Sequence, residues 1–463
     1  MLKCTTLYNM LKNNATEFGD KEAILYDTIS VSYQMLFEDA VKKALHLMRF
    51  EGKEIAIYGP ASYRWIVNVF GTILAGKDAV LIDSFAPANI RKEKLSKVGI
   101  DYVLCSTNQY VLSDAGANIL HGAEKDDVTG LTYNANTAEG NVILFTATAW
   151  DGDKPCVITM KNILTAVKRM NDHCECTEED RVLSQIELTR IFGLVYSLFW
   201  PLANGACVCV GRGIRHIDSD TFYYNPTILP GTPSVMNYCN RISAFNPEIR
   251  KVIIGDSPCP FRLYEALSDR DISVYTVYGS AENTGSVAIN VSVDGAYDLL
   301  DDSCVFIAED GEILVKGDCI TPGYYNDKDA TDRVIKDGIH HTGDYGRFNG
   351  KGQLVITRRN SGIILLPTGA KICKKMTSDE ITQINGVAEA RVILCDDKLV
   401  AAVVPINKDD KPDKFKKRID KYNENKGYRW EIQKVVVLDR PLPRYEDGSI
   451  DDNELEDIVL KEM

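Results

Sequence analysis

The sequence predicts an α/β protein with a large N-terminal domain of mixed parallel sheets flanked by helices, a β-rich subdomain, and a small α+β C-terminal domain. Two observations predict this class. Between residues 54 and 279, short apolar runs alternate with longer amphipathic runs, as in strands joined by crossover helices. Beyond residue 290, short strands punctuated by DG, GD and NGKG turn signals replace that pattern. We expect a large domain over 1–358, with the β-rich part at about 290–358, and a small domain over 361–463.

The alternating region can be divided element by element from its hydrophobic pattern. Short, mostly apolar runs are expected to be strands, and runs with helical spacing are expected to be helices. The first strands and helices alternate along EIAIYG (54–59), SYRWIVNVFGTILAG (62–76), DAVLID (78–83), IRKEKLSKVG (90–99) and DYVLCS (101–106). The pattern resumes with NVILFT (141–146), TMKNILTAVKRMNDH (159–173), RVLSQI (181–186), FGLVYSLFWPLANG (192–205), ACVCVG (206–211), PTILPG (226–231), RKVIIG (250–255) and ISVYTVYG (272–279).

The last part of the chain predicts hairpins and one polar helix. CVFIAEDGEILVKGD (304–318) and YGRFNGKGQLVITRR (345–359) are typical of short strands joined by tight turns. EARVILCDD and KLVAAVVPI (389–406) predict a further hairpin. DKFKKRIDKYNENKG (413–427) predicts a solvated helix that ends at Gly427, and EIQKVVVLD (431–439) predicts a strand.

Composition excludes some partners. With 53 Lys and Arg against 66 Asp and Glu, the net charge of −13 argues against nucleic acid as a partner over most of the surface. The most apolar long window, 65–82, is interrupted by polar residues and glycines, so we expect no membrane span. The thirteen cysteines lack zinc-site spacing and are expected to be reduced and mostly buried, as in a cytoplasmic protein. Cys207 and Cys209 share a strand face and are interpreted as core residues.

One stretch has the position of a phosphate-binding loop. FTATAWDGDKP (145–155) follows the apolar run NVIL and ends in a lysine. Small residues after a strand can close backbone N–H groups and hydroxyls around a phosphate. The short strings YGSAE (278–282) and HTGD (341–344) are weak signals separately, but they follow this stretch in a fixed order.

Residues 310–359, from DGEILVKGD through HTGDYGRFNGKGQLVITRR, resemble nearly without gaps the matching stretch of the adenylate-forming superfamily of acyl-CoA synthetases, aryl-CoA ligases, luciferases and adenylation domains. Further pieces match in order. They are the phosphate-loop position at 145, LTRIFGL at 188, PTILPGTPS at 226, IIGDSPCP at 253 and PLPRYEDGS at 441. The resemblance covers most of the chain.

The resemblance implies an activity. Members of this superfamily activate a carboxylic acid with ATP, giving an acyl-adenylate and pyrophosphate, and pass the acyl group to the thiol of CoA or of a carrier-protein phosphopantetheine arm. It therefore implies ATP or AMP and Mg²⁺ as ligands, and a small carboxylic acid with CoA or an acyl carrier protein as partners. It also implies that the small domain is mobile, with a hinge near Ser361.

The resemblance assigns roles on the nucleotide side of the site. Tyr278 would stack on adenine next to Gly279, at the end of a strand where an α/β sheet binds ligands. Glu282 would hold Mg²⁺, which prefers carboxylate oxygens, and would act in catalysis. Asp344 would accept hydrogen bonds from both ribose hydroxyls. Arg359 would contact the ribose and the α-phosphate side. Each residue also has a purely structural alternative: Tyr278 as a core aromatic, Glu282 as an acid at a helix start and Asp344 as a turn residue. Because the three occur together in the order of the superfamily, we favour the site interpretation.

On the phosphate side, the chain departs from the superfamily pattern. Thr146 aligns with the first threonine of the loop and Lys154 with its lysine, which gives Lys154 a catalytic role on the phosphates. Two lost hydroxyl donors would cost about 1.5 to 3 kcal/mol each. A one-residue shift of the alignment puts Gly152 on the second glycine. The replaced loop positions are Thr148, Ala149, Trp150, Asp151 and Asp153.

Two further departures concern catalysis and the acid pocket. Ser449, in LPRYEDGS, stands where the superfamily has a catalytic lysine near the C-terminus. Losing a preorganised cation costs about 10²- to 10³-fold in rate. Arg190 stands beside the predicted acid pocket with Gly255 and Asp256. It either neutralises an acidic substrate or carrier phosphate or forms a salt bridge with Asp256.

Two functional hypotheses remain open. The chain is either an acid–thiol ligase or a degenerate, ATP-inactive homologue, a possible pseudoenzyme, that binds an acyl group, AMP or a carrier protein as a scaffold. A dinucleotide-dependent oxidoreductase is excluded because no G-x-G-x-x-G follows an early strand, and GRGIR at 211 is interpreted as a strand-end turn. No G-x-S-x-G motif indicates a nucleophilic hydrolase.

Overall fold

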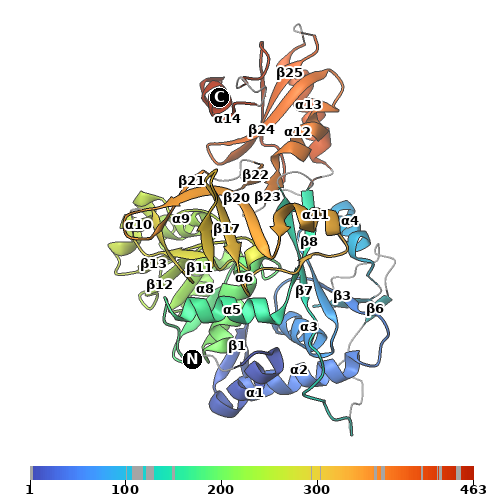
Figure 1. The fold of residues 1–463 in the computed structure, drawn as a ribbon, viewed down its shortest axis with the longest axis vertical. Helices are drawn as coiled ribbons and strands as arrows, with labels where there is room; N and C mark the ends of the chain where they lie inside the picture. Colours follow the sequence, from blue (N-terminus) through green and yellow to red (C-terminus); the bar gives the residue numbers. More distant parts are fainter. Residues whose placement is uncertain are drawn as a thin grey trace. The chain divides into compact units, whose positions relative to one another are not determined.

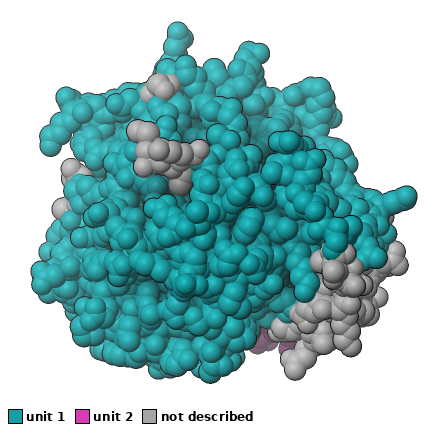
Figure 2. All heavy atoms as spheres, turned by 90° about the horizontal axis from the view of Figure 1, so that it is seen from below, with its two compact units in different colours: residues 1–84, 91–145, 155–359 teal, residues 85–90, 146–154, 360–463 magenta. Residues whose placement is uncertain are grey.

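The structure is a computed structural model that describes most of the 463 residues and divides them into two compact units (Figures 1 and 2). Unit 1 comprises Met1–Ser84, Arg91–Phe145 and Pro155–Arg359. Unit 2 comprises Phe85–Ile90, Thr146–Lys154 and Asn360–Met463. The sequence prediction placed the two short segments of unit 2 in the larger domain. The described residues are 4–100, 102–106, 118–120, 130–148, 152–292, 295–302, 304–358, 362–366, 371–407, 410–424, 426, 430–444 and 450–462.

Two large sheets organise the first part of the chain, and both contain the predicted parallel strands. The 7-stranded sheet has the order β18-β8-β7-β4-β3-β5-β6, in which β3 is parallel to β4 and β5. Its strands are β3 (Glu54–Tyr58), β4 (Asp78–Ile82), β5 (Tyr102–Cys105), β6 (Asn118–Leu120), β7 (Val142–Thr148), β8 (Gly152–Ile158) and β18 (Gly323–Tyr324).

The 14-stranded sheet joins the predicted β-rich part to the alternating part. Its order is β16-β17-β20-β21-β15-β14-β13-β12-β11-β9-β10-β1-β2, with β19 paired to β20. The strands from β13 to β1 are parallel, and those from β16 to β14 are antiparallel. The members are β1 (Glu22–Tyr26), β2 (Ile29–Ser32), β9 (Arg181–Ser184), β10 (Cys207–Val210), β11 (Ile228–Gly231), β12 (Lys251–Ile254), β13 (Ser273–Tyr278), β14 (Ala288–Asn290), β15 (Ala296–Leu299), β16 (Val305–Ile307), β17 (Glu312–Lys316), β19 (Ile335–Lys336), β20 (Ile339–Phe348) and β21 (Leu354–Arg358).

Helices pack against these sheets, and their starts follow local sequence signals. α5 begins after Thr159, whose side chain accepts from the Asn162 backbone N–H in a capping box. α1, α2 and α3 pack against one another (blue in Figure 1). The helices of this part are α1 (Leu7–Phe18), α2 (Tyr33–Leu47), α3 (Tyr63–Leu74), α4 (Ala88–Val98), α5 (Met160–Asn171), α6 (Ile191–Leu194), α7 (Trp200–Ala203), α8 (Ile217–Tyr224), α9 (Pro233–Arg241), α10 (Phe261–Ser268) and α11 (Lys328–Val334).

The run FGLVYSLFWPLANG forms one helical segment with a local irregularity that the sequence did not predict. Between α6 and α7 the chain forms the π-helix η2 (Val195–Phe199), and all five residues of η2 are buried. π-helical turns of this kind occur mostly as single turns inside α-helices. The apolar pattern of 192–205 therefore predicted the helix but not its local geometry.

The described part of unit 2 beyond residue 360 is a small α+β body with its own core. Its three-stranded sheet has the order β24-β25-β26, and the predicted hairpin is confirmed by antiparallel pairing from Val387↔Pro405 to Cys395↔Lys398. Phe415 on α13 and Ile381 on α12 are fully buried in its core. The elements are β22 (Ile363–Leu365), β23 (Lys371–Cys373), α12 (Lys374–Thr382), β24 (Val387–Cys395), β25 (Lys398–Pro405), α13 (Pro412–Asn423), β26 (Lys434–Val437) and α14 (Asp452–Glu462). Gly427, the predicted end of a helix, lies outside the described residues.

The cysteines and apolar helices agree with the composition. All thirteen cysteines lie among the described residues and none of them is in a disulfide, and Cys207 and Cys209 belong to a hydrophobic core. Among the helices that the structure describes, none has both the length and the apolar character needed to cross a bilayer.

Candidate functional site

Tyr278 and Asp344, predicted from separate motifs, lie next to each other in unit 1. Tyr278 is the last residue of β13, and its hydroxyl donates a hydrogen bond to Asp344 Oδ2 at 2.8 Å. Tyr278 is 3% exposed, whereas Asp344, on β20, is part-exposed. A phenol held this way fixes the direction of the carboxylate, so Asp344 presents a charged acceptor in a defined orientation.

The part of β20 that carries Asp344 is braced by Glu312, which the sequence did not indicate as a site residue. Glu312 Oε1 accepts from the Gly343 backbone N–H at 2.8 Å, and Oε2 lies 2.9 Å from His341 Nδ1. Gly343 has φ +70°, a conformation that favours glycine. Glu312 is the first residue of β17, in the stretch DGEIL. Its partner Gly343 lies 31 residues further along the chain, so the sequence pattern around Glu312 could not predict this contact.

Gly279 allows the chain to turn sharply from Tyr278 toward Glu282. A Cβ atom at Gly279 would lie 2.5 Å from the backbone carbonyl carbon of Gly285, so a larger residue would force two backbone segments apart. The 3-10 helix η4 (Ala281–Asn283) follows and carries Glu282. The glycine of YGSAE is therefore required by packing, next to the predicted ligand residues.

Glu282 is a buried carboxylate with a specific hydrogen-bond donor. It is 7% exposed, and its Oε1 accepts from the Tyr324 hydroxyl at 2.7 Å. Burial raises the pKa of Glu282, but the nearby His340 and the Tyr324 hydrogen bond outweigh burial and lower it. Burial lowers the pKa of His340, whereas the charges of Glu282 and Asp344 raise it. Because the pKa of Glu282 is lowered from a value that is already acidic, we infer an ionised Glu282 at neutral pH.

The chemistry around Glu282 fits a magnesium ion that is shared with a substrate. The described residues contain no group of three or more His, Cys, Asp or Glu side chains that could hold a metal by themselves. Mg²⁺ usually binds through one or two carboxylates, several waters and the phosphates of the substrate. One ionised, oriented carboxylate is the contribution that such a site needs from the protein.

The predicted phosphate loop is shorter in the structure than in the sequence interpretation. Residues 145–148 continue β7 and residues 152–155 belong to β8, because the two strands are neighbours in the 7-stranded sheet and their pairing extends into both ends of the predicted loop. Thr146 is buried on β7, and Lys154 is part-buried on β8. Both belong to unit 2, whereas Tyr278, Glu282 and Asp344 belong to unit 1.

Thr148 and Gly152 flank this shortened connection. The Thr148 hydroxyl donates to the Gly152 carbonyl oxygen at 2.9 Å, so it is engaged with the protein backbone. Gly152 has φ +68°, and a Cβ there would lie 2.8 Å from Met376 Sδ. The conformation requires glycine at 152, which agrees with the alignment shifted by one residue.

Arg190, Gly255 and Asp256 lie together on two neighbouring segments. Arg190 Nη1 is 3.7 Å from Asp256 Oδ2, and Arg190 Nε is 3.4 Å from Glu187 Oε2, so the structure contains the salt bridge considered from sequence. Asp256 has φ +68° at the end of β12. A Cβ at Gly255 would lie 2.3 Å from the Phe192 ring, so glycine permits this close packing.

Several predicted positions lie outside the described residues. Arg359 and Ser449 belong to this group, as do three positions of the predicted phosphate loop, namely Ala149, Trp150 and Asp151. Their roles stay predictions.

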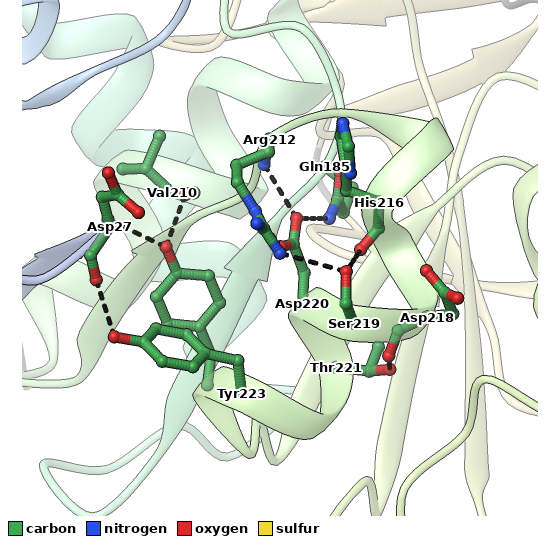
Figure 3. A network of polar contacts seen from close by, with 11 residues as sticks. Asp27, Gln185, Val210, Arg212, His216, Asp218, Ser219, Asp220, Thr221 and Tyr223 are labelled. Carbon is green, nitrogen blue, oxygen red and sulfur yellow. Dashed lines mark hydrogen bonds and ion pairs between the residues drawn. The ribbon is translucent and has the colours of Figure 1, made fainter.

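The GRGIR stretch at 211 forms the predicted strand-end turn after β10 (Figure 3). Asp220 of α8 is fully buried and accepts from the Arg212 backbone N–H at 2.8 Å and from Arg212 Nε at 2.7 Å. Gln185 Nε2 donates to the same carboxylate at 2.8 Å. Both carboxylate oxygens therefore bind protein donors, which indicates a structural network.

Comparison with known proteins gives one family match and many relatives. The AMP-binding enzyme family matches residues 152–325. The chain is 24% identical over 426 residues to the 2-succinylbenzoate–CoA ligase of Bacillus cereus (strain AH820), covering 85% of this chain and 86% of that protein. It is 23% identical over 505 residues to the D-alanine–D-alanyl carrier protein ligase of Staphylococcus aureus (strain MRSA252), covering 98% and 99%.

A solved structure shares the fold over nearly the whole length. It is the o-succinylbenzoate CoA synthetase from Bacillus subtilis bound with a product analogue, with a TM-score of 0.83, 21% identity and coverage of 97% of this chain and 98% of that one. The same Bacillus subtilis enzyme in complex with ATP and magnesium ion gives a TM-score of 0.70 at 21% identity, covering 96% and 99%. These likenesses confirm the predicted α/β fold class.

Proposed function

We propose that this chain, which belongs to the adenylate-forming superfamily, is an acid–thiol ligase that activates a small carboxylic acid as an acyl-adenylate and transfers it to CoA or a carrier-protein thiol. The observation that carries the proposal is the oriented Asp344 carboxylate beside Tyr278, with the buried Glu282 carboxylate on the turn that follows. Family membership alone would not assign roles, so each role is argued from its residue.

The nucleotide would bind at the end of β13 and beside the part of β20 that carries Asp344. Asp344 would accept from both ribose hydroxyls, and the Tyr278 hydroxyl keeps the carboxylate turned toward them. The Tyr278 ring, next to Gly279, would flank the adenine. Arg359 would contact the ribose and the α-phosphate side. Nucleotide selection would thus rest on residues whose orientation is fixed before the ligand arrives.

Chemistry at the phosphates would combine a metal with residues near 146–154. Magnesium, when bound, would neutralise phosphate charge, and Glu282 would hold it. Thr146 and Lys154 would contribute a hydroxyl and a cation to the phosphates. The acid carboxylate would attack the α-phosphorus, the α–β phosphoanhydride bond would break, and pyrophosphate would leave. The acceptor thiolate would then attack the acyl carbon and release AMP.

The acid would bind next to Arg190, Gly255 and Asp256. Arg190 is shared between Glu187 and Asp256 at distances of 3.4 and 3.7 Å, which are longer than a direct charge-assisted hydrogen bond. An acidic group on the substrate would compete with these carboxylates for the guanidinium. The pocket would therefore accept a small acid with a polar or charged substituent.

The acceptor and the C-terminal region would define the second half-reaction. Relatives include a CoA ligase and a carrier-protein ligase, so both thiols are candidates for this chain. We propose that residues 361–463 form a mobile domain and that residues 1–358 form the nucleotide-binding domain. Thirteen cysteines without a disulfide suit a reducing compartment such as the cytoplasm.

The ATP-inactive alternative gains no support from the comparisons. The relatives carry ligase names, and a neighbour in fold was solved with ATP and magnesium ion. The doubt about ATP and Mg²⁺ that followed from the replaced loop residues is therefore not borne out.

Calorimetric titration tests the proposal directly. We expect the full chain to bind Mg·ATP and AMP, and to catalyse acid-dependent exchange of pyrophosphate into ATP with a panel of small acids. Incorporation of the acid into CoA or into a carrier protein would then identify the acceptor. AMP binding with no detectable Mg·ATP binding and no exchange would refute the ligase function.

A further inference from the structure

Two adjacent tyrosines donate their hydroxyls to two different carboxylates. Tyr324 and Tyr325 follow each other where β18 ends, and successive side chains of an extended strand point to opposite faces. The Tyr324 hydroxyl donates to Glu282 at 2.7 Å, and the Tyr325 hydroxyl donates to Glu54 at 2.5 Å. The two residues can be compared directly, because both donate to a carboxylate but only Tyr324 is bonded to a residue of the predicted nucleotide site.

Burial makes the Tyr324 hydrogen bond important for Glu282. Glu282 is 7% exposed and Tyr324 is 6% exposed, so the carboxylate has lost most of its hydration. A buried ionised group depends on protein donors in place of water. The Tyr324 hydroxyl is a donor of this kind, in hydrogen-bond contact with Glu282 Oε1.

Both ends of the hydrogen bond are anchored independently. The Tyr324 backbone N–H donates to Thr331 Oγ1 at 2.9 Å, and Tyr324 pairs with Cys156 of β8. On the other side, the Glu282 carbonyl oxygen accepts from the Thr321 backbone N–H at 2.9 Å. With both backbones fixed, the hydroxyl determines how the carboxylate is rotated.

We propose that Tyr324 is a positioning residue that orients the Glu282 carboxylate toward the magnesium ion of bound Mg·ATP. This inference rests on the proposed function and names a residue that the motif analysis did not single out. An oriented carboxylate matters because Mg²⁺ demands nearly ideal octahedral geometry. Groups that orient metal ligands typically contribute about 10- to 100-fold to metal affinity.

The test compares metal-dependent with metal-independent nucleotide binding. In Tyr324→Phe, Mg·ATP should bind about 10- to 100-fold more weakly, because the carboxylate loses a charge-assisted donor. AMP measured in the presence of EDTA should bind as it does to the wild type, because AMP binding does not involve Glu282. A purely structural role would weaken both ligands together. Calorimetric titration of the full chain with each ligand separates the two roles.

Tyr325→Phe is the matched control. It removes the same hydroxyl from the neighbouring residue and breaks a hydrogen bond to a carboxylate, Glu54, that has no part in the proposed site. We expect it to leave both Mg·ATP and AMP affinities unchanged. Equal losses of Mg·ATP affinity in the two variants would contradict a specific role for Tyr324.

A double-mutant cycle with Glu282→Gln shows whether Tyr324 acts through Glu282. The Tyr324→Phe effect on Mg·ATP affinity should disappear in the Glu282→Gln background, because the two changes remove one interaction. An additive effect would overturn the inference. If the phenylalanine variant does not fold, site-specific 4-aminophenylalanine, which keeps a donor at the same place, should retain Mg·ATP binding, and loss of that binding would count against the proposal.

The outcomes distinguish this inference from the proposed function. Wild-type protein that binds no Mg·ATP would overturn both. Wild-type protein that binds Mg·ATP, together with a folded Tyr324→Phe variant of equal Mg·ATP affinity, would overturn only the role of Tyr324.

Discussion

Two carboxylates of unit 1, Asp220 and Asp344, illustrate opposite uses of the same chemical group. Asp220 is fully buried, and its two oxygens accept from Arg212 and Gln185 (Figure 3). Asp344 is part-exposed and is oriented by the Tyr278 hydroxyl. The first carboxylate is surrounded by protein donors that tie a turn to a helix, and the second is held in place with access to solvent.

The difference provides a rule for telling structural from ligand-binding acids in this fold. A buried carboxylate loses its water and needs protein donors in its place. When both of its oxygens accept hydrogen bonds from the protein, it stabilises the folded state. A carboxylate that a neighbouring hydroxyl orients and that solvent reaches, like Asp344 on β20, can bind a ligand. Glu282 lies between these cases, since it is buried but lies on the turn that follows Tyr278, whose hydroxyl binds Asp344.

The largest expected effect is on stability, from Asp220→Ala. The Arg212 backbone N–H and the Gln185 amide would each lose an acceptor, at about 1 to 3 kcal/mol a group. We expect the free energy of unfolding to fall by about 2 to 6 kcal/mol, measured by chemical denaturation. The affinity of the folded fraction for AMP should be unchanged. Weaker AMP binding would contradict the assignment of Asp220 as a purely structural acid.

Asp344→Ala should give the opposite pattern. Two charge-assisted hydrogen bonds to ribose hydroxyls would be lost, so AMP affinity should fall about 100-fold, as measured by titration calorimetry. The free energy of unfolding should change by less than about 1 kcal/mol, because the residue is part-exposed. A large loss of stability with intact AMP binding would assign Asp344 to the structural class.

Tyr278→Phe sharpens the comparison by removing only the hydroxyl that orients Asp344. The ring remains, so contacts with a base would persist, whereas the carboxylate would lose a donor at 2.8 Å. We expect AMP to bind about 10-fold more weakly. Combined with Asp344→Ala, the change should add little, and full additivity would show that the two residues act separately.

The smallest effect concerns the acid stability of unit 2. Burial raises the pKa of Asp452, but hydrogen bonds and charge from Arg391 and Lys374 outweigh it and lower the pKa. A lowered folded-state pKa stabilises the protein fully above the unfolded value of about 3.9. The contribution is lost as the pH falls through the lower folded value.

Asp452→Asn provides the measurement for this prediction. The difference in the free energy of unfolding between wild type and Asp452→Asn should be constant near neutral pH and shrink below about pH 4. Denaturation series at several pH values would show it. A difference that does not depend on pH would place Asp452 outside the structural class.

The order of the strands and helices could be predicted because it depends on local hydrophobic periodicity. Every predicted strand of the alternating region forms, from Glu54–Tyr58 to Ser273–Tyr278, and the polar helix at Pro412–Asn423 has its apolar residues Phe415 and Ile419 buried. The predicted loop at 145–155 was wrong in extent, because both strands continue into it by sheet pairing. Pairing is a tertiary effect that a single strand does not encode.

The motifs alone determined which residues belong to the candidate site, since the types and order of Tyr278, Glu282 and Asp344 are fixed along the chain. Only the tertiary structure decided that Glu312 and Tyr324 hold two of them, because these partners come from other strands. It also decided that Asp220 is a structural acid. A side chain's chemistry is written in the sequence, but its hydration and hydrogen-bond donors depend on which distant segments pack around it.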